Sequence, residues 1–142
     1  RLIEIYEIRE SLEGLACKLA ATNANRTDCL ALRSIITEQR LQMTQNNGDL
    51  APLKEGDLDL HFSIVKVSGN TQLFQLLCHD LYQLVQLYRL QPNTSPSRPH
   101  IALEEHTQIV DAIERKDPEL ADLLMRRHIS NARQELLANL SL

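Results

Sequence analysis

Apolar residues recur at alternating spacings of three and four along most of this chain, and this period constrains the fold more than any other feature. Residues three or four positions apart lie on one face of an α-helix, so such a series predicts an amphipathic helix. The first segment, from Leu2 to about Thr22, is expected to be a helix with one buried face. The apolar series on this face is Ile5, Ile8, Leu12, Leu15 and Leu19.

Turn and capping signals divide the rest of the sequence into further helices. Asn23 to Arg26 interrupts the first helix, and Thr27 is the expected N-cap of a second helix that ends at Asn46-Asn47-Gly48. The expected ranges of the others are Leu53–Val67, about 20 residues after the capping residue Asn70, His100–Arg115, and Asp117-Pro118 to about Leu140. The sequence thus predicts an all-α fold: an antiparallel bundle of about six helices forming one domain over residues 1–142.

Composition agrees with this fold and excludes several classes of protein. The 142 residues include only 4 Gly and 5 Pro and no Trp. A formal net charge of -4 argues against a DNA-binding surface on this segment. The 3 cysteines form no C-x-x-C pair, which favours a reducing cytoplasm over a disulfide framework. No apolar run approaches the roughly 20 residues that cross a bilayer, so no membrane partner is expected.

Four residues on the apolar faces of three predicted helices are candidate metal ligands. Asp57 and His61 lie one turn apart on one face of the third helix, and His106 and His128 lie within the apolar stripes of two later helices. Buried carboxylates and imidazoles need polar partners, and one divalent cation bound by all four would supply them. The donor set suits zinc, with nickel and manganese as alternatives.

The alternative for each histidine is a buried neutral ring satisfied by hydrogen bonds, an interpretation that weakens when three such residues face one bundle. His79 and His100 fall at polar positions and are left out of the site. Asp59 is two residues from Asp57 and is therefore expected to face solvent.

The residues that a metal-dependent hydrolase needs are missing. The sequence has no H-E-x-x-H, and no histidine has a glutamate three positions before it, as di-metal bundle enzymes require. Glu105 directly precedes His106 and therefore points about 100° away around the helix. A divalent ion with one carboxylate and three neutral imidazoles keeps a charge of about +1, which suits a small anionic ligand. We therefore expect a binding site and no enzyme activity.

Three further residues are candidate contacts of that ligand. Arg9 lies at the edge of the buried face of the first helix, where its guanidinium can hold a carboxylate near the metal. The alternative is an ion pair with Glu13, one turn along, worth a few tenths of a kcal/mol. Arg89, near the end of the fourth helix, is a candidate of the same kind. Asn70 is first a helix cap, with a role in the pocket as the second interpretation.

Several short motifs occur in an order and spacing that resemble a known family over nearly the whole chain. They are Ile8-Arg9-Glu10-Ser11-Leu12-Glu13, Leu19-Ala20-Ala21, Asp57-Leu58-Asp59-Leu60-His61, Ser68-Gly69-Asn70, the stretch from Glu105 to Ile113, and Ala121-x-x-x-Met125-x-x-His128. The chain resembles the C-terminal effector-binding and oligomerisation domain, of the FCD type, of FadR-type regulators in the GntR superfamily of bacterial transcription factors. Position 60 is Leu where this family usually has Phe.

The resemblance implies that Asp57, His61, His106 and His128 are the ligands used by the metal-binding members of the family. It also implies a winged-helix domain, N-terminal to this chain, that binds operator DNA as part of a homodimer. That expectation agrees with a sequence that starts at Arg1 within a helical pattern, as a fragment would. We expect a cytoplasmic effector-sensing domain that binds a divalent metal and a small organic acid. A small helical metalloenzyme acting on an organic acid and a purely structural metal are the alternatives.

Overall fold

Every secondary-structure element in the part of the chain that the structure describes is a helix, which confirms the predicted all-α class. The computed structural model describes residues 2–45, 53–84 and 98–140, apart from the side chains of 53–58 and 139–140. The elements are α1 (Leu2–Asn23), α2 (Arg26–Gln45), α3 (Leu53–Val67), α4 (Thr71–Phe74), the π-helical segment η1 (Gln75–Leu81), α6 (Arg98–Glu114) and α7 (Pro118–Leu140). Across these residues, none of the helices is long and apolar enough to span a membrane.

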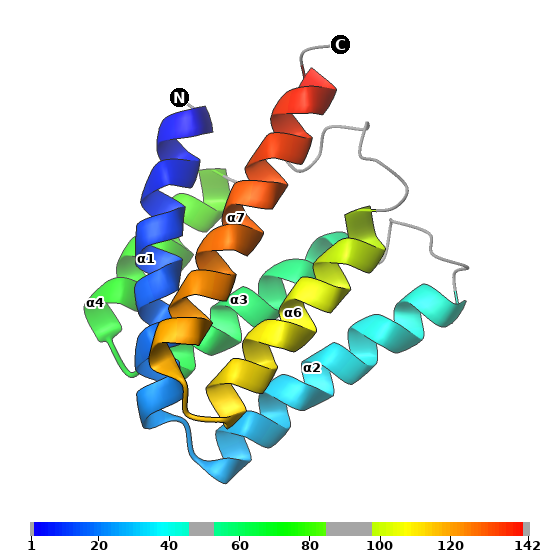
Figure 1. The fold of residues 1–142 in the computed structure, drawn as a ribbon. Coiled ribbons are helices and arrows are strands. Elements are labelled where there is room, and N and C mark those ends of the chain that lie inside the picture. Colours follow the sequence, from blue (N-terminus) through cyan, green and yellow to red (C-terminus); the bar gives the residue numbers. More distant parts are fainter. Residues whose placement is uncertain (1, 46–52, 85–97, 141–142) are drawn as a thin grey trace.

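Helices α3, α6 and α7 are distant in sequence but contribute to one shared apolar core next to α1. The blue α1 and the orange-to-red α7 lie side by side, and α6 lies between α7 and α2 (Figure 1). Helix α3 contacts both α1 and α2, and η1 also packs on α1. One apolar cluster contains buried residues from all of these elements. This packing brings α3, α6 and α7, which carry the candidate histidine ligands, together next to α1.

Capping side chains set the helix starts, and one predicted cap was wrong. Asn25, and not Thr27, caps α2: its side-chain oxygen accepts from the Asp28 N–H at 2.8 Å. The Asp28 carboxylate accepts in return from the Asn25 N–H at 3.0 Å, so two orphan backbone donors are satisfied reciprocally and the helix begins earlier. The predicted caps Asn70 and Asp117 are confirmed, because each accepts a backbone N–H three residues along, at 3.0 and 3.2 Å.

The segment after Asn70 was predicted as one continuous α-helix and is instead a short α4 that passes into η1. Leu77 and Cys78 are adjacent buried residues, and the buried residues Leu73 and Tyr82 each lie four and five positions from this pair, a spacing that fits the wider π-helical turn. The Tyr82 N–H accordingly donates to the Leu77 carbonyl, five residues back. The predicted stop at Asn46-Asn47-Gly48 and the far end of the fourth helix lie outside the described residues.

The predicted buried face of α1 was also partly wrong. Ile8 and Leu15 are 48% and 38% exposed, whereas Arg9 and Glu13 are 4% and 1% exposed. Helix α7 packs closely on Gly14, where an added Cβ would meet Asp122 and Arg126, and Arg9 and Glu13 lie within this face as an ion pair. The buried residues of this face are Leu2, Ile5, Tyr6, Arg9, Glu13, Gly14, Ala16, Cys17, Ala20 and Ala21.

The revised cap of α2 can be tested by two matched alanine variants. Asn25→Ala removes the acceptor of an orphan N–H and should lower the free energy of unfolding by about 1 kcal/mol. Thr27→Ala changes a residue inside the helix and should have an effect of less than about 0.5 kcal/mol. Urea titrations followed by circular dichroism measure both values. The opposite order would restore Thr27 as the cap.

Candidate metal centre

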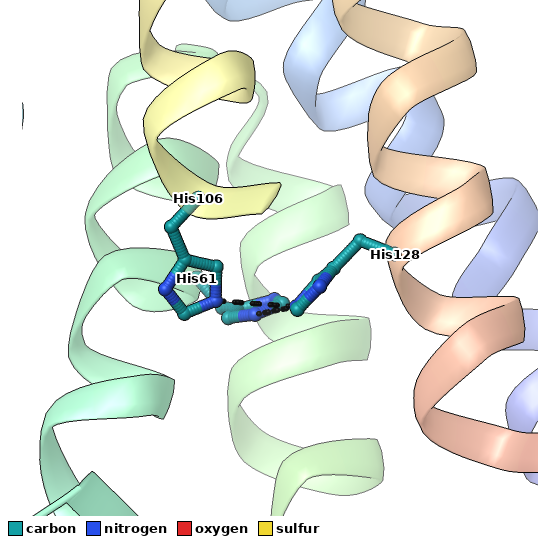
Figure 2. A group of neighbouring side chains, drawn as sticks. All are labelled: His61, His106 and His128. Atoms are coloured by element: carbon teal, nitrogen blue, oxygen red, sulfur yellow. Dashed lines mark hydrogen bonds between the residues drawn. The ribbon is translucent and has the colours of Figure 1, made fainter. Parts of the chain in front are cut away.

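Three histidine side chains from three helices meet in the core. His61 of α3, His106 of α6 and His128 of α7 are each 2% exposed. The Nε2 atom of His128 lies 3.2 Å from that of His106 and 3.3 Å from that of His61 (Figure 2). The three candidate ligand nitrogens all lie within 4.8 Å of one another. The Nε2 sides of the rings therefore converge on one point.

The opposite side of each ring is held by a side-chain oxygen from another helix. His61 Nδ1 donates to Glu13 of α1, and His106 Nδ1 donates to Gln39 of α2 at 3.0 Å. His128 Nδ1 donates to Glu105 of α6 at 2.8 Å. Since ionised carboxylate and amide oxygens only accept hydrogen bonds, these contacts place a proton on each Nδ1. In a neutral ring, Nε2 then carries the lone pair that a metal ion needs.

The geometry fits a divalent metal. Three imidazole nitrogens that face one point form a donor set that a single divalent cation can bind at once. A tetrahedral zinc ion with Zn–N bonds of roughly 2.0–2.1 Å holds its ligand nitrogens about 3.3–3.4 Å apart. Two of the three observed separations, 3.2 and 3.3 Å, are close to that value, and the third is at most 4.8 Å.

The structure brings together three of the four predicted ligand residues. Asp57 lies on α3 one turn before His61, but its side chain is outside the described residues, and so is Arg89. His79, His100 and Asp59 are exposed, in agreement with their exclusion from the predicted site.

Glu13 is the centre of a buried polar network, of which the sequence predicted only the Arg9–Glu13 ion pair, as the alternative role of Arg9. One carboxylate oxygen accepts from His61 and, at 2.7 Å, from the Tyr82 hydroxyl, and the other accepts from Arg9 Nε at 2.6 Å. Burial alone would raise the pKa of Glu13, but the positive charge of Arg9 and the hydrogen bonds from His61 and Tyr82 lower it to about 2. The Arg9 guanidinium packs over the Tyr6 and Tyr82 rings, 4.9 and 5.6 Å from their centroids.

Glu105 occupies an equivalent place beside His128. Its carboxylate also accepts from Arg98 at 2.8 Å and from Asn131 at 2.6 Å. Partial burial acts to raise the pKa of Glu105, but the hydrogen bonds from His128 and Asn131 and the charge of Arg98 hold it below its usual value. Glu105 was predicted to point about 100° away from His106 around the same helix. This direction agrees with the structure, in which the Glu105 carboxylate contacts His128 of α7.

Comparison with known proteins gives this site its context. A family model described as the FCD domain matches residues 4–131. The chain belongs to the FCD domain family. This match confirms the resemblance found in the sequence, and the regulator names of the relatives agree with the expectation that the domain is not an enzyme.

Curated relatives of this FCD domain are named as regulators of operons. It is 28% identical to the Uxu operon regulator of Haemophilus influenzae, over 94% of this chain and 50% of that protein. It is 27% identical to the probable D-xylose utilization operon transcriptional repressor of Paenarthrobacter nicotinovorans, over 91% of this chain and 55% of that protein. It is 25% identical to the Glc operon transcriptional activator of Escherichia coli, over 95% and 55%. The chain spans about half the length of these relatives.

Two solved structures share the fold. The TM-score is 0.76 to Streptococcus agalactiae GntR, at 22% identity over 94% of this chain and 58% of that one. It is 0.80 to E. coli McbR/YncC, at 21% identity over 96% of this chain and 68% of that one. These likenesses support the helical fold of the FCD domain.

The lowered pKa of Glu13 predicts a pH-dependent stability for the metal-free domain. A glutamate in the unfolded chain titrates near about 4.3, whereas folded Glu13 titrates at about 2. Ionised Glu13 therefore stabilises the fold above the unfolded pKa, and this contribution is lost as pH falls from about 5 towards 2. Urea titrations in the presence of a chelator should show the free energy of unfolding falling across this range.

Glu13→Gln should flatten that fall, because the variant has no carboxylate to protonate at this position. Glu10→Gln is the matched control, since Glu10 lies on the same helix and pairs with Arg133 instead of a histidine. If Glu13→Gln kept the pH slope of the unmodified domain, the assigned ionisation of Glu13 would be wrong.

Proposed function

We propose that this FCD domain binds a divalent metal ion in the core of an antiparallel helical bundle and uses it to sense a small organic acid. The proposed ligands are Asp57, His61, His106 and His128. The observation that supports the proposal is the convergence of three Nε2 atoms whose rings are each fixed through Nδ1 by an oxygen acceptor. Zinc suits this donor set, and nickel and manganese are the alternatives.

The charges around the histidines favour an anionic ligand. The carboxylates of Glu13 and Glu105 are each paired with an arginine, and Gln39 is neutral. These groups therefore add no net charge to the site. A divalent ion with the Asp57 carboxylate and three neutral imidazoles keeps a charge of about +1, which a small carboxylate would offset while completing the coordination.

Arg9 is the proposed second anchor of that carboxylate. It is buried and bonded to Glu13 through Nε, while a guanidinium also carries four N–H donors on its two Nη atoms. These donors form the edge that suits bidentate contact with a carboxylate. Arg89 and the side-chain amide of Asn70 are further proposed contacts, although the Asn70 side-chain oxygen is already used to cap α4.

For the whole protein we propose a cytoplasmic, homodimeric transcription regulator with a winged-helix DNA-binding domain N-terminal to this chain. The chain covers about half of relatives that are named as operon regulators, which leaves room for such a domain in a full-length protein. A ligand that binds one arrangement of two protomers more tightly would shift the balance between arrangements, and hence the spacing of the two DNA-binding domains.

The ligand assignment predicts the metal content of single variants. The unmodified domain and His79→Ala should each retain about one divalent ion per chain after dialysis, because His79 is exposed and outside the cluster. His106→Ala removes one donor and should lose most of the metal under the same conditions. Elemental analysis by mass spectrometry measures the content. Full metal occupancy in His106→Ala would show that the four-residue ligand set is wrong.

The sensing role predicts that acid binding depends on the metal and on Arg9. Calorimetric titration of the metal-loaded domain with a panel of small monocarboxylic, dicarboxylic and hydroxy acids should find saturable binding without turnover. Removing the metal, or changing Arg9 to Gln, should weaken binding of the same acid at least about tenfold. Binding that survives metal removal would favour a purely structural metal, and chemical conversion of the acid would contradict the sensor assignment.

A further inference from the structure

We infer that Glu13 and Glu105 are positioning residues of the metal centre, each fixing the tautomer and orientation of one histidine while an arginine fixes the carboxylate in turn. The inference rests on the proposed metal centre and concerns residues outside the ligand set. Histidine ligands commonly donate Nδ1–H to a carboxylate, which makes Nε2 a better donor to the metal. The described residues contain two such Arg–Glu–His series.

The first Arg–Glu–His series links α1 to α3. The Arg9–Glu13 contact is 2.6 Å, with both side chains at least 95% buried, and the other oxygen of Glu13 accepts from His61 Nδ1. The Tyr82 hydroxyl, placed at the end of η1, donates to the same oxygen at 2.7 Å. Three donors on two oxygens leave Glu13 little freedom to rotate. The His61 ring is consequently held with Nε2 directed at the cluster.

The second Arg–Glu–His series links the start of α6 to α7. Arg98 and His128 Nδ1 both lie 2.8 Å from one Glu105 oxygen, and Asn131 donates to the other oxygen at 2.6 Å. The Arg98 and Glu105 side chains are 14% and 15% exposed, so this Arg–Glu pair is less buried than the Arg9–Glu13 pair. The arrangement is the same as in the first series: the arginine pairs with the carboxylate, the carboxylate accepts from Nδ1 of the histidine, and Nε2 faces the centre of the cluster.

His106 differs from the other two histidines because its Nδ1 donates to the neutral amide oxygen of Gln39. An amide oxygen fixes the tautomer but adds no negative charge to the hydrogen bond, and charge-assisted bonds are roughly twice as strong as neutral ones. The two carboxylates should therefore strengthen the donor character of His61 and His128 specifically. Removing either charge without changing the shape of the side chain isolates this contribution.

The experiment is a titration with Co²⁺ alone of the unmodified domain, Glu13→Gln, Glu105→Gln and the control Glu104→Gln. Glu104 is the exposed neighbour of Glu105 on α6. The two positioning variants should bind Co²⁺ about 10- to 100-fold more weakly and show altered d–d absorption bands of the bound ion, while Glu104→Gln keeps the unmodified affinity and spectrum. Circular dichroism checks that helix content is unchanged.

The outcomes separate this inference from the proposed function. If Glu105→Gln and a folded Glu13→Gln both bind Co²⁺ with unmodified affinity and spectrum, the carboxylates are only structural ion-pair partners and the inference is overturned. If Glu13→Gln does not fold, Glu105→Gln decides alone, because its site is more exposed. Failure of the unmodified domain to bind Co²⁺ would instead overturn the metal centre itself.

Discussion

The architecture of this domain depends on one buried carboxylate. Glu13 is 1% exposed, and a buried carboxylate without partners would cost several kcal/mol. Its partners are Arg9 on its own helix, His61 on α3 and Tyr82 after η1. Satisfying Glu13 therefore fixes how α1, α3 and the end of η1 pack together, and the same contacts direct one histidine at the centre of the core.

The fold and the three histidines could be predicted because both depend on short-range spacing. The apolar period and the Asp117-Pro118 signal placed α3 and the start of α7, and the positions of His61, His106 and His128 within apolar stripes showed that they face inward. Asp57 and Arg89 remain predictions, because their side chains lie outside the described residues.

The partners of the histidines could not be predicted, because each contact joins residues far apart in sequence. An Arg–Glu pair four positions apart usually faces solvent. Tyr82 and His61, which are 69 and 48 residues from Glu13, supply the hydrogen bonds that support its burial. Because Ile8 and Leu15 were predicted to be buried, the predicted buried face of α1 was centred away from Arg9 and Glu13. Gln39 carries no local signal at all. For Glu105, the angle of about 100° from His106 was a usable clue. It excluded His106 as the hydrogen-bond partner of Glu105 and pointed to a residue on a neighbouring helix.

We propose that a metal ion lies between the three Nε2 atoms of the cluster. The most direct test is a crystal structure of the zinc-loaded domain with diffraction data collected on both sides of the zinc absorption edge. We expect one anomalous peak per chain at roughly 2.0–2.1 Å from Nε2 of His61, His106 and His128. A peak elsewhere, or one bonded to the Nδ1 atoms with the rings turned over, would contradict it.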